Sequence, residues 1–300
     1  MQVELAQLEY TLPRLTRMWA HLEKYRGGIG MRGPGETQLE TDRRLINHRI
    51  KVLRHRLEEV QKSREVQRGS RSGEFQASLV GYTNAGKSSI LRAMANDSAV
   101  FVENRLFATL DPLTREVDLG DGQAVLLTDT VGFVRKLPHQ LVASFRATLE
   151  EVLEADVLLH VIDVSDPLWE DHRAVVLEVL SDLGAIEKPV INVFNKSDLL
   201  PPEQLEAVRE RVMNLVPDAV FVSAEVPGEL EPLRRALARR ERAEREVVEV
   251  RLPLSDGRAL AELYRDGDVL SQRTEGDEIV VHARVPKAMR GRLGERAVVV

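Results

Sequence analysis

The chain has 300 residues, a formal net charge of −6 and no cysteine. This length suits roughly two domains, and the sequence holds no apolar run that approaches the roughly 20 residues needed to cross a bilayer. The absence of cysteine excludes disulfides and thiolate metal sites. We therefore expect a globular protein with no membrane span, cytoplasmic or peripheral to a membrane, and monomeric in isolation.

Charge is distributed unevenly along the chain. Residues 1–75 hold 15 Lys and Arg against 10 Asp and Glu, whereas the remainder holds 27 against 38. A basic arm on an acidic body favours a polyanionic partner for the arm. A solvated helical face would have the same composition, so charge alone leaves both interpretations open.

The basic arm predicts two long helices. Each has an apolar seam with heptad-like spacing of three and four, made of Leu5, Leu8, Leu12, Leu15, Trp19 and Leu22 in the first and of Ile46, Ile50, Leu53, Leu57 and Val60 in the second. The stretch between them, residues 27–35, holds five glycines and cannot continue a helix. We predict an antiparallel helical hairpin over residues 1–68 with a tip loop at about 27–38.

The predicted tip is longer than the about 2–8 residues that usually join two helices. Its glycines allow close approach of a ligand to the backbone, and Arg26 and Arg32 offer planar donors to phosphate. Arg43 and Arg44 lie near the base of the second helix. These features favour a binding tip over a flexible connector.

A polar, turn-rich segment at Arg64–Glu74 predicts a linker, most clearly at 69–74, before a domain over residues 75–245. In that domain, strands and helices alternate, which predicts an α/β fold with a mostly parallel, doubly wound, six-stranded sheet. The expected strands are Phe75–Val80, Arg115–Leu119, Ala124–Thr128, Val157–Asp163, Val190–Asn195 and Ala219–Ser223, with a hairpin turn at Asp121-Gly122. The expected helices are Ser89–Asn96, Leu141–Glu154, Glu170–Leu183, Pro202–Leu215 and Leu230–Glu246.

The last segment, residues 246–300, predicts a small α+β domain. Its expected strands are Val247–Leu254 and Glu278–Val285, and Asp256–Tyr264 is expected to form a short helix between them.

The sequence GYTNAGKSS at Gly81–Ser89 fits the phosphate-loop pattern G-x-x-x-x-G-K-[ST], between an expected strand and an expected helix. The backbone N–H groups of such a loop point at phosphate oxygens, and the helix N-terminus adds positive potential. Lys87 would reach the outer phosphates and the Ser88 hydroxyl would hold Mg²⁺. A glycine-containing turn that matches by chance is the alternative. The loop residues expected to bind nucleotide are Gly81, Tyr82, Thr83, Asn84, Ala85, Gly86, Lys87, Ser88 and Ser89.

Asn195-Lys196-Ser197-Asp198 follows an apolar strand and predicts the choice of base. The Asp198 carboxylate can accept both N–H groups on the edge of guanine, whereas adenine presents an acceptor at one of those positions. Such a buried mismatch costs on the order of several kcal/mol, because polar groups are left unpaired. Asn195 would tie this loop to the phosphate loop, and the Lys196 stem would lie along the base. Backbone N–H groups at the end of the next strand would reach the guanine carbonyl, from Val222, Ser223 and Ala224.

Two further segments predict contacts to Mg²⁺ and to the third phosphate. Asp129 would hold Mg²⁺ through water, and the Gly132 N–H would sense the γ-phosphate. Thr109 is the candidate for a hydroxyl that closes on Mg²⁺, with Thr83 and Thr114 as rivals. The other residues expected at the nucleotide are Phe107, Ala108, Leu110, Asp111, Thr130 and Val131.

Motifs in this order resemble the translation-factor-like class of GTPases, and nearly the whole chain is similar to the HflX family of ribosome-associated GTPases. Three stretches carry the narrower resemblance: GGIGMRGPGETQLETDRR at Gly27–Arg44, GYTNAGKSS at Gly81–Ser89, and LFATLDPLTR at Leu106–Arg115 with DTVGF at Asp129–Phe133. Family members usually have Thr at the position of Leu113 and an α/β domain before the hairpin. This chain begins within the first helix, as a fragment, a trimmed form or a short member would.

The resemblance implies a factor that binds GTP and associates with the 50S ribosomal subunit. Its hairpin tip would contact 23S rRNA, through Arg26, Gly28, Arg32, Gly33, Arg43 and Arg44. The GTP-bound state would help to separate stalled or idle 70S ribosomes, and hydrolysis to GDP would release the factor.

The residue after Gly132 is Phe133, which cannot orient water as the Gln of many small GTPases does. We therefore expect slow hydrolysis by the protein alone and activation by the ribosome. In the resembling GTPases, an Asn at the position of Asn84 often accompanies a K⁺ ion at the phosphates, so we also expect K⁺ to stimulate turnover. The residues expected to act in catalysis are Asn84, Lys87, Thr109 and Gly132.

Three alternatives remain open from the residues. A tRNA- or rRNA-maturation GTPase shares the apolar residue after Gly132 and often Asn84, but would not carry the GGIGMRGPGET stretch. A ribosome-binding module could use GTP as a structural ligand with negligible turnover. An ATPase is opposed by Asp198.

Overall fold

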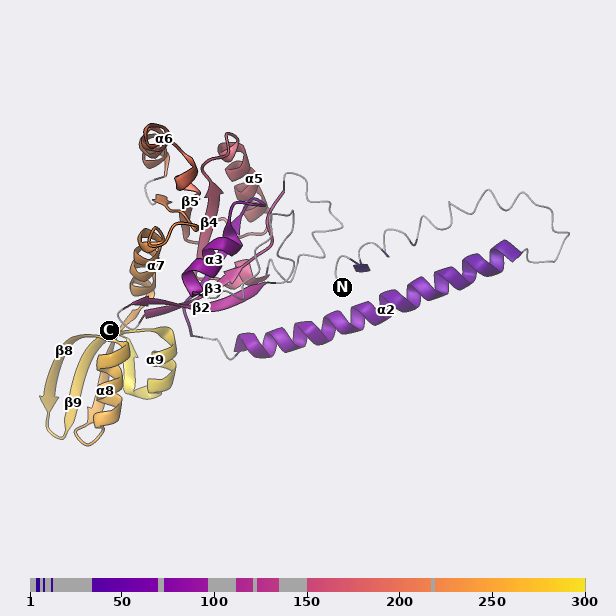
Figure 1. Cartoon of the computed structure of the whole chain (residues 1–300). Coiled ribbons are helices and arrows are strands. Elements are labelled where there is room, and N and C mark those ends of the chain that lie inside the picture. The colour runs from indigo at the N-terminus through magenta and orange to yellow at the C-terminus, as the bar shows by residue number, and fades with distance from the viewer. Residues whose placement is uncertain are drawn as a thin grey trace. The chain divides into compact units, whose positions relative to one another are not determined.

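The computed structural model describes residues 4, 5, 8, 12, 34–69, 73–96, 112–120, 123–134, 150–216 and 219–299. The chain forms two compact units, of which one contains helix α2 and the other contains both β-sheets (Figure 1). The helices are α2 (Pro34–Gly69), α3 (Lys87–Ala95), α5 (Trp169–Asp182), α6 (Pro202–Leu215), α7 (Glu231–Glu244), α8 (Gly257–Asp266) and α9 (Lys287–Leu293), with short 3₁₀ turns η1 (Ser197–Leu199) and η2 (Gly294–Arg296). In the ranges given above, no helix is both long and apolar enough to cross a membrane.

Helix α2 is longer at both ends than the sequence predicts. It begins at Pro34, inside the stretch expected to be the tip loop, and continues to Gly69, past the predicted start of the linker at Arg64. Proline is common at the first position of a helix, because its fixed φ suits the helix and an N–H group at that position would have no partner within the helix. The predictions of a loop to residue 38 and of a linker from residue 64 are therefore wrong.

The apolar seam of α2 is confirmed by burial. Ile50 and Leu53 are 6% and 1% exposed, whereas Leu45, which lies off the seam, is 61% exposed. Within the same unit, Arg49 donates two hydrogen bonds to Glu4 Oε1 at 2.8 and 2.9 Å. Four residues of the predicted first helix are described as helical, Glu4, Leu5, Leu8 and Leu12.

The larger sheet has six strands in the order β2-β3-β1-β4-β5-β6. Its strands are β1 (Gln76–Gly81), β2 (Leu113–Gly120), β3 (Gln123–Asp129), β4 (Val157–Asp163), β5 (Val190–Asn195) and β6 (Ala219–Phe221). Strand β2 is antiparallel to β3, and all the other pairs are parallel. This architecture confirms the predicted mostly parallel six-stranded sheet, and it brings the carboxyl ends of β1, β3, β4 and β5 to one edge.

Helices cover both faces of this sheet. On one face, α3 and α7 pack through residues such as Ile90 and Leu237 against Leu79 and Leu127. On the other, Val212 of α6 and Trp169 of α5 pack around the buried Phe194. Of the predicted helix Leu141–Glu154, the structure describes residues 150–154, and they are helical.

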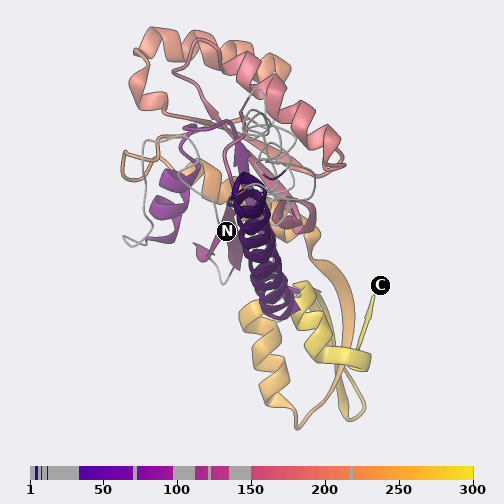
Figure 2. The same cartoon turned by 90° about the vertical axis from the view of Figure 1, so that its right-hand side faces the viewer.

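The smaller sheet, at the C-terminal end of the chain, is antiparallel with strand order β10-β7-β9-β8. Its strands are β7 (Glu246–Pro253), β8 (Asp268–Glu275), β9 (Glu278–Val285) and β10 (Ala297–Val299). Leu263 of α8 and Met289 of α9 pack on the same face of this sheet, in the orange to yellow part of the chain in Figure 2. The α+β prediction is confirmed, but it did not include β8, α9 and β10.

Candidate functional site

The phosphate-loop residues turn sharply between β1 and α3. Asn84 and Gly86 have left-handed backbones with φ of 61° and 95°, and α3 begins directly afterwards at Lys87. A Cβ atom at Gly86 would collide with Nδ2 of Asn195. The first turn of α3 has N–H groups that a helix cannot pair internally, so the loop presents donors at the carboxyl edge of the sheet, where an anion binds well.

Lys87 is buried against this loop. Its Nζ donates to the carbonyl oxygens of Gly81 at 3.2 Å and Tyr82 at 3.0 Å. Burial lowers the pKa of Lys87 to about 8, and the nearby Asp129 carboxylate opposes that shift. A Cβ atom at Gly132 would lie 2.8 Å from Thr83 Cα and 3.2 Å from Lys87 Nζ. The backbone of Gly132 thus lies close to the ammonium group, as a joint contact to one terminal phosphate would require.

Ser88, at the start of α3, and Asp129, at the end of β3, together present two oxygen atoms that could bind a metal ion. The Ser88 hydroxyl donates to Asp129 Oδ2 at 2.6 Å, and Asp129 is 1% exposed. Hydroxyl and carboxylate oxygens are ligands that Mg²⁺ prefers, and Mg²⁺ usually takes further ligands from phosphate and water. No group of three or more His, Cys, Asp or Glu side chains that could hold a metal by itself occurs in the described part of the chain. The donor pair therefore suits a metal that arrives with a phosphate ligand.

The segment after Asp129 is joined to the phosphate loop by its backbone. The Thr83 N–H donates to the carbonyl oxygen of Phe133 at 2.8 Å, and the Phe133 N–H donates to that of Gly81 at 3.0 Å. The Thr130 hydroxyl donates to the carbonyl oxygen of Leu79 at 2.6 Å. Phe133 is 2% exposed, so its ring is buried in the protein and offers nothing polar to a water molecule.

Asn195 links the predicted base-side loops to the phosphate loop. Its Nδ2 donates to the carbonyl oxygen of Ala85 at 3.0 Å, and its Oδ1 accepts from the Ala224 N–H at 3.1 Å. The Ser197 hydroxyl donates to the carbonyl oxygen of Val222 at 2.9 Å. One buried amide thus joins three segments that lie up to 139 residues apart, at Ala85 and Ala224. The tie to the phosphate loop is the one expected of Asn195 from sequence.

The remaining base-side residues lie at the same edge. Lys196 has a left-handed backbone with φ of 65°, and its Nζ contacts Asp163 Oδ2 at 2.6 Å. Asp198 is exposed in the turn η1. The Ala224 N–H, expected to reach guanine, donates to Asn195 in this structure. Asp163 was not predicted from sequence. The available signal was its place at the carboxyl end of β4, next to the phosphate-loop strand.

Several predicted residues fall outside the described part of the chain, namely Phe107, Ala108, Thr109, Leu110 and Asp111 at the nucleotide and Arg26, Gly28, Arg32 and Gly33 at the tip. Of the rivals to Thr109, Thr114 lies on β2 with its hydroxyl 2.9 Å from that of Thr128, and Thr83 lies in the loop. Arg43 and Arg44 are exposed on α2.

Comparisons with known proteins support the interpretation of both units. Residues 1–71 match a family model described as the GTP-binding GTPase middle region, and residues 76–196 match one described as 50S ribosome-binding GTPase. The chain is 47% identical over 296 residues to GTPase HflX of Magnetococcus marinus and 43% identical over 289 residues to GTPase HflX of Escherichia coli K12. These alignments cover 98% and 95% of the chain and 67% of each relative, so the chain spans about two thirds of their length.

Solved structures share the fold. A GTP-binding protein from Sulfolobus solfataricus in complex with GDP is 23% identical, with a TM-score of 0.51 over 80% of this chain and 65% of that one. A second GDP complex, of SsGBP, is 24% identical with a TM-score of 0.52.

Proposed function

The chain belongs to the HflX family of GTPases, and from this membership and the geometry of its site we propose that it hydrolyses GTP in association with the 50S ribosomal subunit and helps to separate stalled or idle 70S ribosomes. The observation that carries the proposal is the position of Asn195. Its amide holds the phosphate loop beside the two loops that would enclose a base. The descriptions of the matching family models name GTP and the 50S ribosome.

Guanine is selected by Asp198 in this proposal. Its exposed carboxylate accepts both N–H groups of the base edge, while Lys196 supports the face of the base. The ion pair of Lys196 with Asp163 favours this arrangement, because it fixes the lysine stem beside the loop. The Gly81–Ser89 loop and the start of α3 hold the phosphates by backbone N–H groups.

Ser88 and Asp129 would hold Mg²⁺, Ser88 directly and Asp129 through water, and Thr109 would complete the set when GTP is bound. The metal supplies charge neutralisation on the phosphate oxygens. Lys87 and the Gly132 N–H bind the terminal phosphate, and their proximity in the structure supports a shared contact.

Turnover by the protein alone is slow in this proposal, because the buried Phe133 cannot orient the attacking water. The ribosome supplies the missing group on docking. Asn84 is exposed on the left-handed turn of the loop. It would help to bind a K⁺ ion at the phosphates, so we expect hydrolysis to be faster in K⁺ than in Na⁺.

Residues 1–68 act as an rRNA-binding hairpin, residues 75–245 as the GTPase domain, and residues 246–300 as a small third domain. The contact between Glu4 and Arg49 favours an arrangement of two antiparallel helices in residues 1–68. Exposed Arg43 and Arg44 on α2, together with Arg26, Gly28, Arg32 and Gly33, would contact the phosphates of 23S rRNA.

The test is GTP hydrolysis with and without 50S subunits, in KCl and in NaCl, with ATP as the nucleotide control. We expect little turnover alone, stimulation by 50S subunits, and a higher rate in KCl. If 50S subunits stimulated hydrolysis in neither salt, the proposed function would be contradicted. Equal rates in KCl and NaCl would contradict only the role of K⁺.

The hairpin is tested by pelleting 50S subunits with a non-hydrolysable GTP analogue. Arg26→Ala combined with Arg32→Ala should weaken binding, and the slope of affinity against salt concentration should become shallower because fewer phosphate contacts are made. Arg211→Ala, an exposed charge change on α6 (62% side-chain exposure), is the matched control. Unchanged binding of the double variant would exclude the tip as the rRNA contact.

A further inference from the structure

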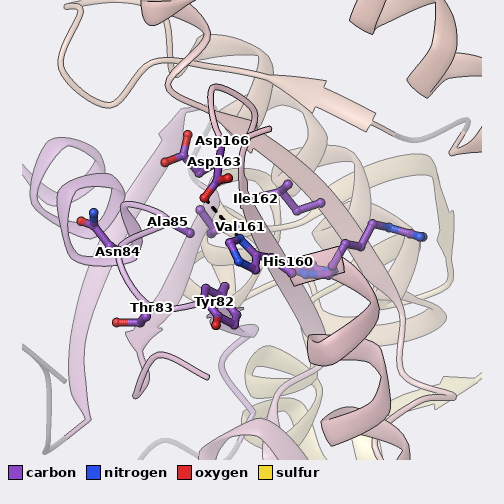
Figure 3. A pocket seen from close by; sticks show the side chains of 11 residues that line it. Tyr82, Thr83, Asn84, Ala85, His160, Val161, Ile162, Asp163 and Asp166 are labelled. Atoms are coloured by element: carbon purple, nitrogen blue, oxygen red, sulfur yellow. Dashed lines mark ion pairs between the residues drawn. The ribbon is translucent and has the colours of Figure 1, made fainter. Parts of the chain in front are cut away.

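A cavity of about 80 Å³ with both polar and apolar lining residues lies behind the phosphate loop (Figure 3). Its walls are formed by Tyr82, Thr83, Asn84 and Ala85, by the end of β4 and by the start of α5. His160 of β4 also lines it, and that residue is 1% exposed with neither ring nitrogen hydrogen-bonded in the part of the chain that the structure describes. The loop therefore borders an open space on this side, and the contacts that cross to α5 contribute to its position.

One such contact is an aromatic stack between the loop and α5. The rings of Tyr82 and His172 lie 3.8 Å apart between centroids, with an angle of 8° between their planes. His172 also contacts the residue Asp166, whose Oδ2 lies 3.4 Å from its Nδ1. The other carboxylate oxygen of Asp166 accepts from the Leu168 N–H at 2.9 Å. The stack therefore connects the phosphate loop to the start of α5.

The backbone of Tyr82 lies at the centre of the phosphate site. Its carbonyl oxygen accepts from Lys87 Nζ at 3.0 Å. The residues on either side of it, Gly81 and Thr83, make the two hydrogen bonds to Phe133, and Phe133 directly follows Gly132. A displacement of the Tyr82 backbone would thus move both the contact of the lysine and the segment that carries the Gly132 N–H.

We propose that the stack of Tyr82 on His172 positions the phosphate loop for hydrolysis, and that His172 is a positioning residue that acts through Tyr82 on Lys87 and Gly132. This inference rests on the proposed GTP hydrolysis and adds α5 to the elements on which the site depends. Asp166 contributes by fixing the orientation of the imidazole ring.

The first test is to remove the ring of His172. If the interaction free energy of an aromatic pair is lost in the transition state, the rate falls by about three- to tenfold. We expect His172→Leu and His172→Gln to lower kcat by about that factor. The KM for GTP should change by less than about twofold, because backbone N–H groups and Asp198 supply most of the ground-state contacts. Glu178→Gln, an exposed change on the same helix, is the control.

The second test restores the stack without the imidazole. His172→Phe keeps a flat ring against Tyr82 and should retain most of the wild-type kcat, although it loses the contact with Asp166. The Tyr82→Leu and His172→Leu double variant should be no slower than the slower single variant, because both changes remove the same interaction.

Three outcomes would overturn the inference: a wild-type kcat in both His172→Leu and His172→Gln, a kcat for His172→Phe as low as that for His172→Leu, or single effects that multiply in the double variant. Thermal unfolding with GDP identifies any variant that is not folded, and His172→Gln then replaces His172→Leu. If the wild-type protein shows no hydrolysis with 50S subunits, the proposed function fails instead.

Discussion

At the scale of single residues, the phosphate site depends on a glycine where a methyl group has no room. Gly86 has a φ of 95°, and a Cβ there would meet the Asn195 amide that holds Ala85. We expect Gly86→Ala to lower the free energy of unfolding by about 1–3 kcal/mol and the affinity for GDP by at least about tenfold, since the lost hydrogen bond connects the phosphate and base loops. Urea unfolding and titration with a fluorescent GDP measure the two effects.

Gly184→Ala is the matched control for that substitution. Gly184 also has a positive φ, of 71°, but a Cβ there would meet nothing within 4 Å. Gly184→Ala should lower the free energy of unfolding by about 1 kcal/mol through backbone strain alone. It should leave the affinity for GDP unchanged. An equal loss of affinity in both variants would show that strain, and not the collision with Asn195, weakens binding.

His160 predicts a dependence of stability on acid pH. Burial, with help from Arg173 and Lys87, lowers the pKa of His160 to about 3. Between pH 3 and 6.5 the folded state therefore binds fewer protons than the unfolded state, so stability falls as the pH falls below 6.5. His160 should lower the free energy of unfolding by on the order of 2–3 kcal/mol between pH 6.5 and 4.5. His160→Phe should lose less stability than the wild type over that range in urea unfolding, and parallel curves would contradict the assignment.

Residue identities at this site are easier to predict than their partners. Lys87, Ser88, Asp129 and Asn195 stand in sequence patterns whose chemistry requires them, and the structure brings them together at one edge of the sheet. The pairing of Lys196 with Asp163 depends on the register between β4 and β5, in which Asp163 lies opposite Asn195. The stack of His172 on Tyr82 likewise needs the path of the chain after β4, which no local pattern encodes.

At the scale of elements, predicted strands were most accurate where they are buried, whereas the mostly exposed helix α6 was located by its proline. Strands β4, β5 and β9 and helix α6 have the predicted bounds, because long apolar runs and a proline at the start of α6 mark them. Strand β8 was missed because most of its residues are exposed, so it lacks the alternation of apolar and polar residues on which strand prediction depends. The ends of α2 were wrong because Gly35 and Gly69 resemble loop residues when they are considered one at a time.

The face of the C-terminal sheet that α8 and α9 leave uncovered has a charged network around Glu249. Its carboxylate lies 2.8 Å from His282 Nε2 and accepts from Arg251 at 2.9 Å. These hydrogen bonds, that of His282 first, lower the pKa of Glu249. Because the folded state favours the ionised form, the stability that Glu249 contributes is present above pH 4.5 and is lost as the pH falls through its lowered value.

Glu249→Gln should therefore lower the Tm at pH 7 and flatten the acid limb of the Tm profile below pH 4.5. The measurement is thermal unfolding by circular dichroism from pH 3 to 7. Glu210→Gln, an exposed change later in α6, is the control and should leave the profile unaltered. A profile of Glu249→Gln that parallels the wild type would mean that the network is formed without consequence for folding.

At the scale of the whole molecule, the junction between the six-stranded sheet and the C-terminal sheet is made by polar contacts. Lys287 of α9 pairs with Asp156 at 3.2 Å, just before β4, and Arg242 of α7 lies 3.5 Å from Asp268 of β8. The chain passes from α7 to β7 through Arg245 alone. The sequence predicted two folded domains over these residues but not these contacts, because each depends on how the domains are docked.

Arg245 is the residue at this junction whose loss should matter most. Its guanidinium donates to both carboxylate oxygens of Glu241, at 2.9 and 3.0 Å, and the two side chains are 4% and 6% exposed. Removing one partner leaves a buried charge without compensation, so Arg245→Met should lower the free energy of unfolding by about 3–5 kcal/mol. Glu241→Leu combined with Arg245→Met should recover most of that loss, since no charge then remains buried.

The same helix offers a control with the same spacing. Arg235 and Glu231 of α7 form an i, i+4 pair at 2.9 Å, but their side chains are 73% and 50% exposed. Water screens such a pair, so Arg235→Met should cost no more than about 0.5 kcal/mol. Urea unfolding of the four proteins measures the differences. If Arg245→Met cost as little as Arg235→Met, the buried pair would not stabilise the end of α7, from which the chain enters the C-terminal domain.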